Sequence, residues 1–182
     1  MTVLSGGRVI AVGSAEEWCA MPPHRVIPLM AILVALKDGA ETITFEPSLL
    51  GPGEVGLKML YSIAGETYEL VPPPAPIAPK MASFVRWMGG IDGLRHRLRQ
   101  GIGRFLGAAG GAEAQGRFQV YLGDERATLL LEVRSHELGS ALHLAVLDWT
   151  PGLGASARSF FIRLAEVSPA ERFTERDFLR YL

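Results

Sequence analysis

The fold is indicated most clearly by the stretch Leu57-Lys-Met-Leu-Tyr-Ser-Ile-Ala-Gly-Glu-Thr-Tyr-Glu-Leu-Val71. Two strand-like segments, 55–63 and 66–71, flank the pair Ala64-Gly65. A two-residue loop that ends in glycine favours a tight hairpin, because such turns need positive φ angles. The stretch therefore predicts an antiparallel β-hairpin.

Further elements are expected on both sides of this hairpin. The alternating segment Thr42-Ile-Thr-Phe-Glu46 predicts a strand that ends at Pro47. More strands are expected at 118–122, 128–134, 142–147 and 160–164. Strands and helices in this order predict an α+β fold, with an antiparallel or mixed sheet and helices packed on it.

Three helices are also expected. The apolar run Leu29–Asp38 predicts a buried helix with Pro28 in its first turn. A second helix should end at Gly89-Gly90 and present one apolar, structural face formed by Met81, Phe84, Val85 and Met88. Ser168-Pro-Ala-Glu171 has the pattern of a capping box, which predicts a last helix to about Tyr181.

Composition bounds the class of protein. The chain has 182 residues, 48% hydrophobic and 20% charged, with a net charge of −1. This length and composition favour one globular domain, or one domain with a modest extension, and the net charge gives no overall field that would attract nucleic acid or an acidic membrane. The single Cys19 and four scattered histidines make no zinc pattern, and no cofactor is expected. No signal peptide and no membrane span is evident, so we expect a soluble, cytoplasmic protein without membrane insertion.

The sequence lacks the usual motifs of nucleotide hydrolysis. A phosphate-binding Walker loop needs Gly-Lys-Ser/Thr, but Lys37, Lys58 and Lys80 follow Leu, Leu and Pro. No Gly-x-Ser-x-Gly nucleophile motif occurs either. The chain is therefore expected not to be an enzyme.

One segment stands out by its charge. No acidic residue lies between Asp92 and Glu113, whereas Arg95, Arg97, Arg99 and Arg104 do. A planar guanidinium can bind phosphate through two hydrogen bonds, so these arginines are candidate contacts to phosphate or to a partner. The alternative is a solvated helix end and loop whose arginines pair with acids elsewhere. Nucleic acid is not expected as a ligand, because no aromatic residue for base stacking lies between these arginines.

Five segments together resemble, in the same order, the domain that precedes the motor in type II secretion and type IV pilus assembly ATPases. They are Ala40–Pro47, the hairpin Leu57–Val71, Phe84–Ile91, Arg97–Arg104 and Leu131–Asp148. The resemblance covers about residues 28–150, which leaves an N-terminal extension at 1–27 and a C-terminal strand and helix extension at 151–182. It implies a mainly antiparallel, PAS-like sheet with packed helices.

The resemblance also implies a role for the arginines. In the full-length ATPases, arginines of this domain reach toward nucleotide held by the motor, and Arg97 and Arg104 match such positions. The chain departs from the family pattern at Ala64, Arg99 and Glu132, where the family has aspartate, proline and arginine. This incomplete set implies relaxed demands on phosphate contact.

Three functional hypotheses follow. The first is a non-catalytic interaction module that docks on a secretion or pilus ATPase or on itself. The second is a PAS-like sensor of a small molecule or nucleotide. The third is an enzyme that uses the arginine segment with Asp148 or Glu132, and the missing nucleophile, metal set and phosphate loop weigh against it.

Overall fold

The computed structural model describes residues 8–91 and 114–167, and within them a single sheet of seven strands. The sheet order is β1-β5-β6-β7-β2-β3-β4, and only the β1–β5 pair is parallel. The expected α+β class with a mainly antiparallel sheet is therefore confirmed. The strands are β1 (Arg8–Ala11), β2 (Thr42–Gly51), β3 (Glu54–Ile63), β4 (Glu66–Leu70), β5 (Ala114–Leu122), β6 (Glu125–His136) and β7 (Gly139–Trp149).

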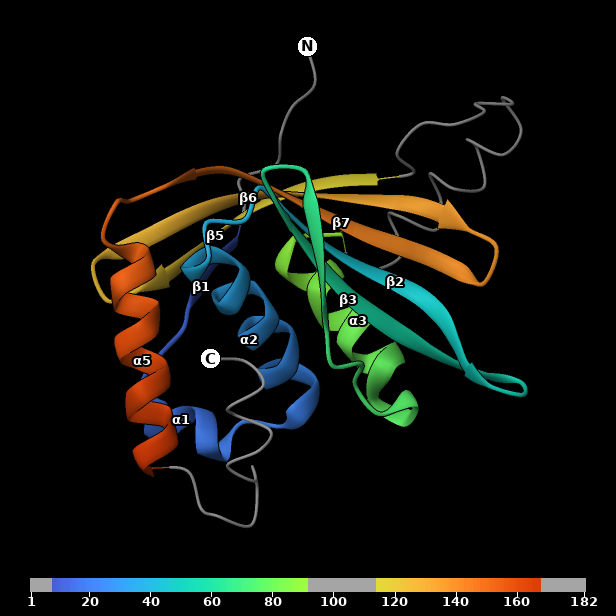
Figure 1. The fold of residues 1–182 in the computed structure, drawn as a ribbon, viewed down its shortest axis with the longest axis horizontal. Coiled ribbons are helices and arrows are strands. Elements are labelled where there is room, and N and C mark those ends of the chain that lie inside the picture. The colour runs from blue at the N-terminus through green and yellow to red at the C-terminus, as the bar shows by residue number, and fades with distance from the viewer. Residues whose placement is uncertain (1–7, 92–113, 168–182) are drawn as a thin grey trace.

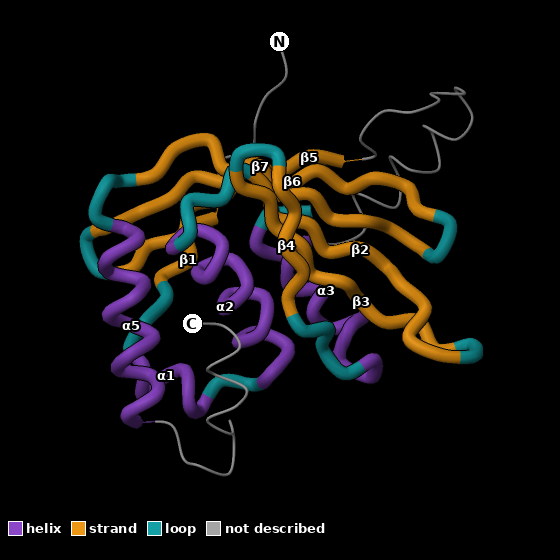
Figure 2. The backbone as a smooth tube through the Cα atoms, viewed as in Figure 1, coloured by secondary structure: helices purple, strands orange, loops and turns teal. Residues whose placement is uncertain are grey.

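The helices of the described residues lie on one side of this sheet, below it in the view of Figures 1 and 2. They are α1 (Ala15–Ala20), α2 (Pro23–Lys37), the 3-10 turn η1 (Ala75–Ile77), α3 (Ala78–Met88) and α5 (Leu153–Val167). Among the described residues, no helix has both the length and the apolar character needed to cross a membrane.

Side chains alternate along the strands between two environments. On β6, Leu129, Leu131 and Val133 are buried against the helices, whereas the residues between them face the other side. Strands β2, β5 and β7 follow the same alternation over their paired segments, as expected for a sheet with one covered face. We call the helix-free side the outer face.

The β3–β4 hairpin confirms the prediction from its turn. Ala64 and Gly65 both have positive φ angles, 50° and 86°, which match the right-handed twist of the two flanking strands. The register pairs Tyr61 with Tyr68, whose rings stack with centroids 5.4 Å apart. The strands predicted at 118–122, 128–134 and 142–147 are also confirmed, within β5, β6 and β7.

Strand β2 is longer than the sequence predicts, because it continues through Pro47 to Gly51. Its ladder with β7 covers only Thr42 to Phe45, whereas its ladder with β3 continues past Pro47. A proline is compatible with a strand where one side needs no hydrogen-bond donor. The prediction that Pro47 ends the strand is therefore wrong.

Helix α2 begins at Pro23, five residues before the predicted first turn. Pro28 is thus inside the helix and buried, which corrects the expectation that it opens the helix. An interior proline removes one backbone hydrogen bond, and the helix tolerates this because almost every residue from Val26 to Leu36 is buried. Tertiary packing outweighs the local penalty.

Helix α3 packs through a face that is close to the predicted one. Met81, Val85 and Met88 are completely buried, but Phe84 is only partly buried and stacks on Trp87 at 5.5 Å. The helix ends at Gly89, as predicted. A Cβ atom on Gly116 of β5 would lie 1.8 Å from the Gly89 carbonyl oxygen, so only glycine permits this approach of helix to strand.

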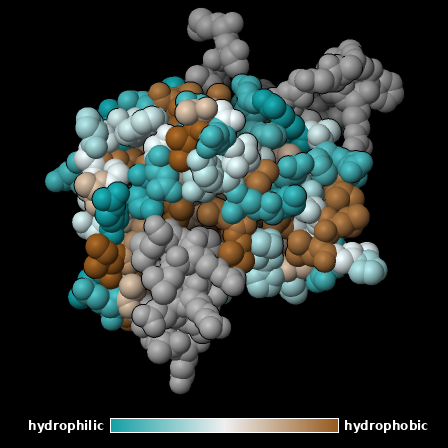
Figure 3. Space-filling view, in the orientation of Figure 1, coloured by the Kyte–Doolittle hydropathy of each residue, from teal (hydrophilic) through white to brown (hydrophobic). Residues whose placement is uncertain are grey.

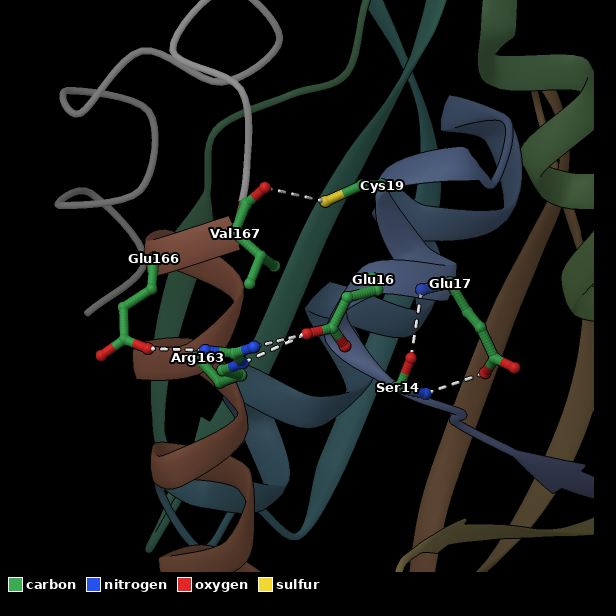
Figure 4. A network of polar contacts seen from close by, with 7 residues as sticks. All are labelled: Ser14, Glu16, Glu17, Cys19, Arg163, Glu166 and Val167. Carbon is green, nitrogen blue, oxygen red and sulfur yellow. Dashed lines mark hydrogen bonds and ion pairs between the residues drawn. The ribbon is translucent and has the colours of Figure 1, made fainter.

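The residues before α2 are part of the fold. Strand β1 pairs with β5, and Trp18 of α1 is 1% exposed and donates its indole N–H to the Val12 carbonyl at 2.5 Å. Ser14 and Glu17 form a complete capping box at the start of α1 (Figure 4). This segment is thus packed against the core, and β1 falls within Arg8–Val12, a stretch whose sequence is compatible with a short strand.

Helix α5 replaces the strand predicted at 160–164. Phe160, Phe161 and Leu164 are buried on one helical face, so the aromatic and branched residues that favour a strand locally serve a helix here. Arg163 of α5 bonds Glu16 of α1 at 2.7 Å and Glu166 at 3.2 Å (Figure 4). The capping box predicted at Ser168–Glu171 lies outside the described residues.

Candidate partner-binding face

The arginines singled out in the sequence, Arg95, Arg97, Arg99 and Arg104, lie outside the described residues. Their role stays a prediction. The other two candidates, Glu132 and Asp148, are described, and both side chains lie on the outer face of the sheet.

Glu132 is held by its neighbours on β5 and β6. The Gln115 amide donates to Glu132 Oε1 at 2.8 Å, and Arg134 donates to Oε2 at 2.6 Å. Both carboxylate oxygens are therefore engaged, and the charge is balanced by Arg134. Glu132 thus links β5 to β6 on this surface through one oxygen and bonds Arg134 on its own strand through the other.

His143 lies beside Glu132 in the sheet, on β7. Its Nδ1 is 3.1 Å from the Thr44 hydroxyl on β2. Burial lowers the pKa of His143 below its usual value, and the positive charge of Arg134 lowers it further. The imidazole is therefore neutral near pH 7 and lies beside the Arg134–Glu132 ion pair.

A second histidine is oriented at the edge of the same face. The Leu138 backbone N–H donates to His136 Nδ1 at 3.2 Å, so that nitrogen is an acceptor. The other nitrogen, Nε2, then carries the proton and lies 3.2 Å from Glu46 Oε1. These two contacts fix the tautomer and tie β2 to the β6–β7 turn.

The face has a hollow of about 460 Å³ across β5, β6 and β7. Arg117, Gln119, Thr128, Leu147 and Asp148 line it. A β-bulge between Thr128 and Leu129 leaves Leu147 without a cross-strand partner on β6, and its side chain is 44% exposed. Two polar side chains of the hollow are bonded to each other, since the Gln119 amide donates to the Thr128 hydroxyl at 3.4 Å.

The two charged groups of the hollow are not bonded in this way. Within the part of the chain that the structure describes, neither the Arg117 nor the Asp148 side chain makes a hydrogen bond or an ion pair. A guanidinium and a carboxylate that share an open hollow can each accept an opposite charge from a partner. No group of three or more metal-ligating side chains occurs among the described residues.

Sequence reasoning alone identified only one of the two charged residues of this hollow. It considered Asp148 as a strand end or a catalytic carboxylate, and the structure places it on the outer face opposite Thr128. It missed Arg117, although the alternation Arg117-Phe118-Gln119-Val120 on β5 would have put that arginine on the solvent side.

Hydrophilic residues predominate on the side of the molecule seen in Figure 3, with smaller apolar areas between them. No protein-family model matches the chain, and a search of curated proteins finds no match, so its function must be inferred from its own residues.

Proposed function

We propose that this chain is a non-catalytic interaction module related to the domain that precedes the motor in type II secretion and type IV pilus assembly ATPases. It docks on a motor ATPase or on another copy of itself. The observation that carries this proposal is the outer face, which no helix of the described residues covers and where the hollow presents the side chains of Arg117 and Asp148 without partners among those residues.

The sheet supports the PAS-like part of the proposal. The order β5-β6-β7-β2-β3 forms a continuous antiparallel sheet. In it, β2 of the β2–β3 pair lies beside β7, the last of the three consecutive strands β5, β6 and β7. Helices pack on this unit from one side. Such a layout agrees with what the resemblance implies, with β1 and β4 added at the two edges.

The lysines support a role without nucleotide hydrolysis. Lys37 ends α2 and pairs with Asp38 at 3.1 Å, and Lys58 on β3 lies 3.9 Å from Glu69. Lys80 is in the first turn of α3, after Pro79. None of the three follows a glycine in a phosphate loop, so any nucleotide in the assembly would come from the partner. We place the module in the cytoplasm, where such motors work.

The test is binding to a purified assembly ATPase from the source organism, followed by biolayer interferometry. Arg117→Glu should weaken binding at least tenfold, because it reverses the charge of the hollow. The matched control is Arg158→Glu, since Arg158 is exposed on α5, away from the outer face. Equal loss with both variants, or wild-type binding by both, would count against docking through this face.

A sensor is the second candidate, and the hollow favours it because a cation and an anion together could hold a small polar ligand. Calorimetry with ATP at low salt separates the two functions. We expect an affinity in the millimolar range or weaker, about 4 kcal/mol. Micromolar ATP binding that is lost in Arg97→Ala/Arg104→Ala would establish a nucleotide sensor instead.

A further inference from the structure

We propose that a second copy of this chain docks on the outer face over β5, β6 and β7, with Arg117 of each copy paired to Asp148 of the other. The proposal rests on the interaction-module function and names one partner of the same face. It starts from two opposite charges that share a hollow without pairing to each other.

The register explains why the two residues do not pair within one chain. Arg117 on β5 lies opposite Leu130, whereas Asp148 on β7 lies opposite Thr128. They are therefore two strand spacings apart, about 10 Å, and offset along β6 by two residues, about 7 Å. Their charged groups occupy opposite margins of the hollow, with β6 between them.

A two-fold axis between two copies can place Arg117 of each copy next to Asp148 of the other. In an isologous contact, residue i of one copy meets residue j of the other, and j then meets i. An axis that lies in the interface, perpendicular to the line from Arg117 to Asp148 and midway along it, brings each guanidinium onto the carboxylate of the other copy. One surface with one cation and one anion thus makes two ion pairs.

Apolar exposure on the same face favours a protein over a small ligand. Leu147 borders the hollow and is 44% exposed, and Val9 on β1, which pairs with Gln119, is 64% exposed. Leu130 lies on β6 between the two charges and is partly exposed. A small zwitterion could contact the charges, but only a broad partner would cover these side chains as well.

The size of the face sets the strength of the contact. Three strands about 4.8 Å apart, each about nine residues long at about 3.4 Å per residue, provide roughly 440 Å² per copy, or roughly 880 Å² in all. This is below the roughly 1,200 Å² at which stable, specific interfaces begin and is the size of a weak, transient contact. We therefore expect a weak, reversible dimer that high salt dissociates, because exposed ion pairs are screened.

The experiment is sedimentation equilibrium of the whole chain at low salt, up to about 1 mM, where weak association is populated. Wild type should dimerise, and Arg117→Asp and Asp148→Arg should each be monomeric, because each brings like charges together. An equimolar mixture of the two variants should form a heterodimer, since every charge then meets its opposite. The double variant Arg117→Asp/Asp148→Arg should recover the homodimer.

Arg158→Asp is the matched control and should dimerise like wild type, and far-UV circular dichroism confirms that each variant is folded. A wild-type monomer at all concentrations, or a mixture that stays monomeric, would overturn the proposal. Saturable amino-acid binding lost in both single variants, without dimers, would point to a zwitterion site. Failure here leaves the motor-binding assay intact as a separate test of the interaction module.

Discussion

Met81 and Phe84 lie on neighbouring turns of α3, yet they are buried to different degrees. Met81 is fully buried, whereas Phe84 keeps one part of its ring against Trp87 at the surface, with the Arg25 guanidinium 5.8 Å from the ring centre. The apolar period of the sequence identifies the packed side of a helix but not how far the packing reaches around it.

Truncation should reveal this difference. Met81→Ala should lower the free energy of unfolding by about 2–5 kcal/mol, because it leaves a cavity in a closed core. Phe84→Ala should cost less, roughly 1–2 kcal/mol, since the ring is only partly removed from water. Urea denaturation measures both. A larger loss for Phe84→Ala than for Met81→Ala would show that the ring is the deeper anchor.

His143 links a single side chain to pH. Because its pKa is lowered in the folded protein, chiefly by burial, the unfolded chain takes up a proton more readily. Stability is therefore unaffected above the unfolded pKa of about 6.5 and is lost as pH falls through it toward the lower folded pKa. His143→Gln should show a smaller loss of stability between neutral and mildly acidic pH, measured as the denaturation midpoint. An unchanged pH slope would exclude His143 as its source.

At the scale of elements, the hairpin and the meander could be predicted because their turn chemistry and alternation are local. The start of α2, the length of β2 and the helical state of 160–164 could not, because each depends on distant packing. Pro28 is tolerated because its helix is buried, and Pro47 because β2 no longer pairs with β7 at that position. The residues next to each proline in the sequence indicate neither of these conditions. Asp148 was considered as a strand end. Arg117 was missed because it shares the hollow with Asp148 only through the strand order, in which β6 lies between β5 and β7.

The contact between α3 and β5 gives a test at this scale. Gly116→Ala should destabilise the fold by about 3 kcal/mol or more, because its Cβ would overlap the Gly89 carbonyl and the backbone must move. Gly51→Ala is the control, since no atom lies within 4 Å of its Cβ position. Thermal melts compare the two. Similar melting temperatures would mean that α3 can move away from the sheet at little cost.

The whole molecule depends on both ends of the described chain. Trp18 and Phe160, from α1 and α5, contact edge to face at 4.8 Å, and Phe161 and Leu164 are each 1% exposed. The region of family resemblance, 28–150, contains neither helix. The elements outside it are therefore packed parts of one core and not loose additions.

A fragment of residues 28–150 should consequently fail to fold on its own. It would lack β1, α1 and α5 and would expose the surface of α2 that α5 covers, so we expect collapsed far-UV and near-UV dichroism signals and aggregation. The full chain under the same conditions is the control. A dispersed amide spectrum from the fragment would instead make it an autonomous domain.

The outermost strands decide how the molecule behaves when crowded. In the described chain β1 has 4 residues and β4 has 5, whereas the inner strands have 9 to 12, and β4 carries Glu66 and Glu69. Two short edge strands, one of them acidic, offer little template for growth of a sheet from one molecule to the next. Concentrated samples should therefore remain clear and free of fibrils, and any association that they show should come from the broad face of the sheet and not from its rim.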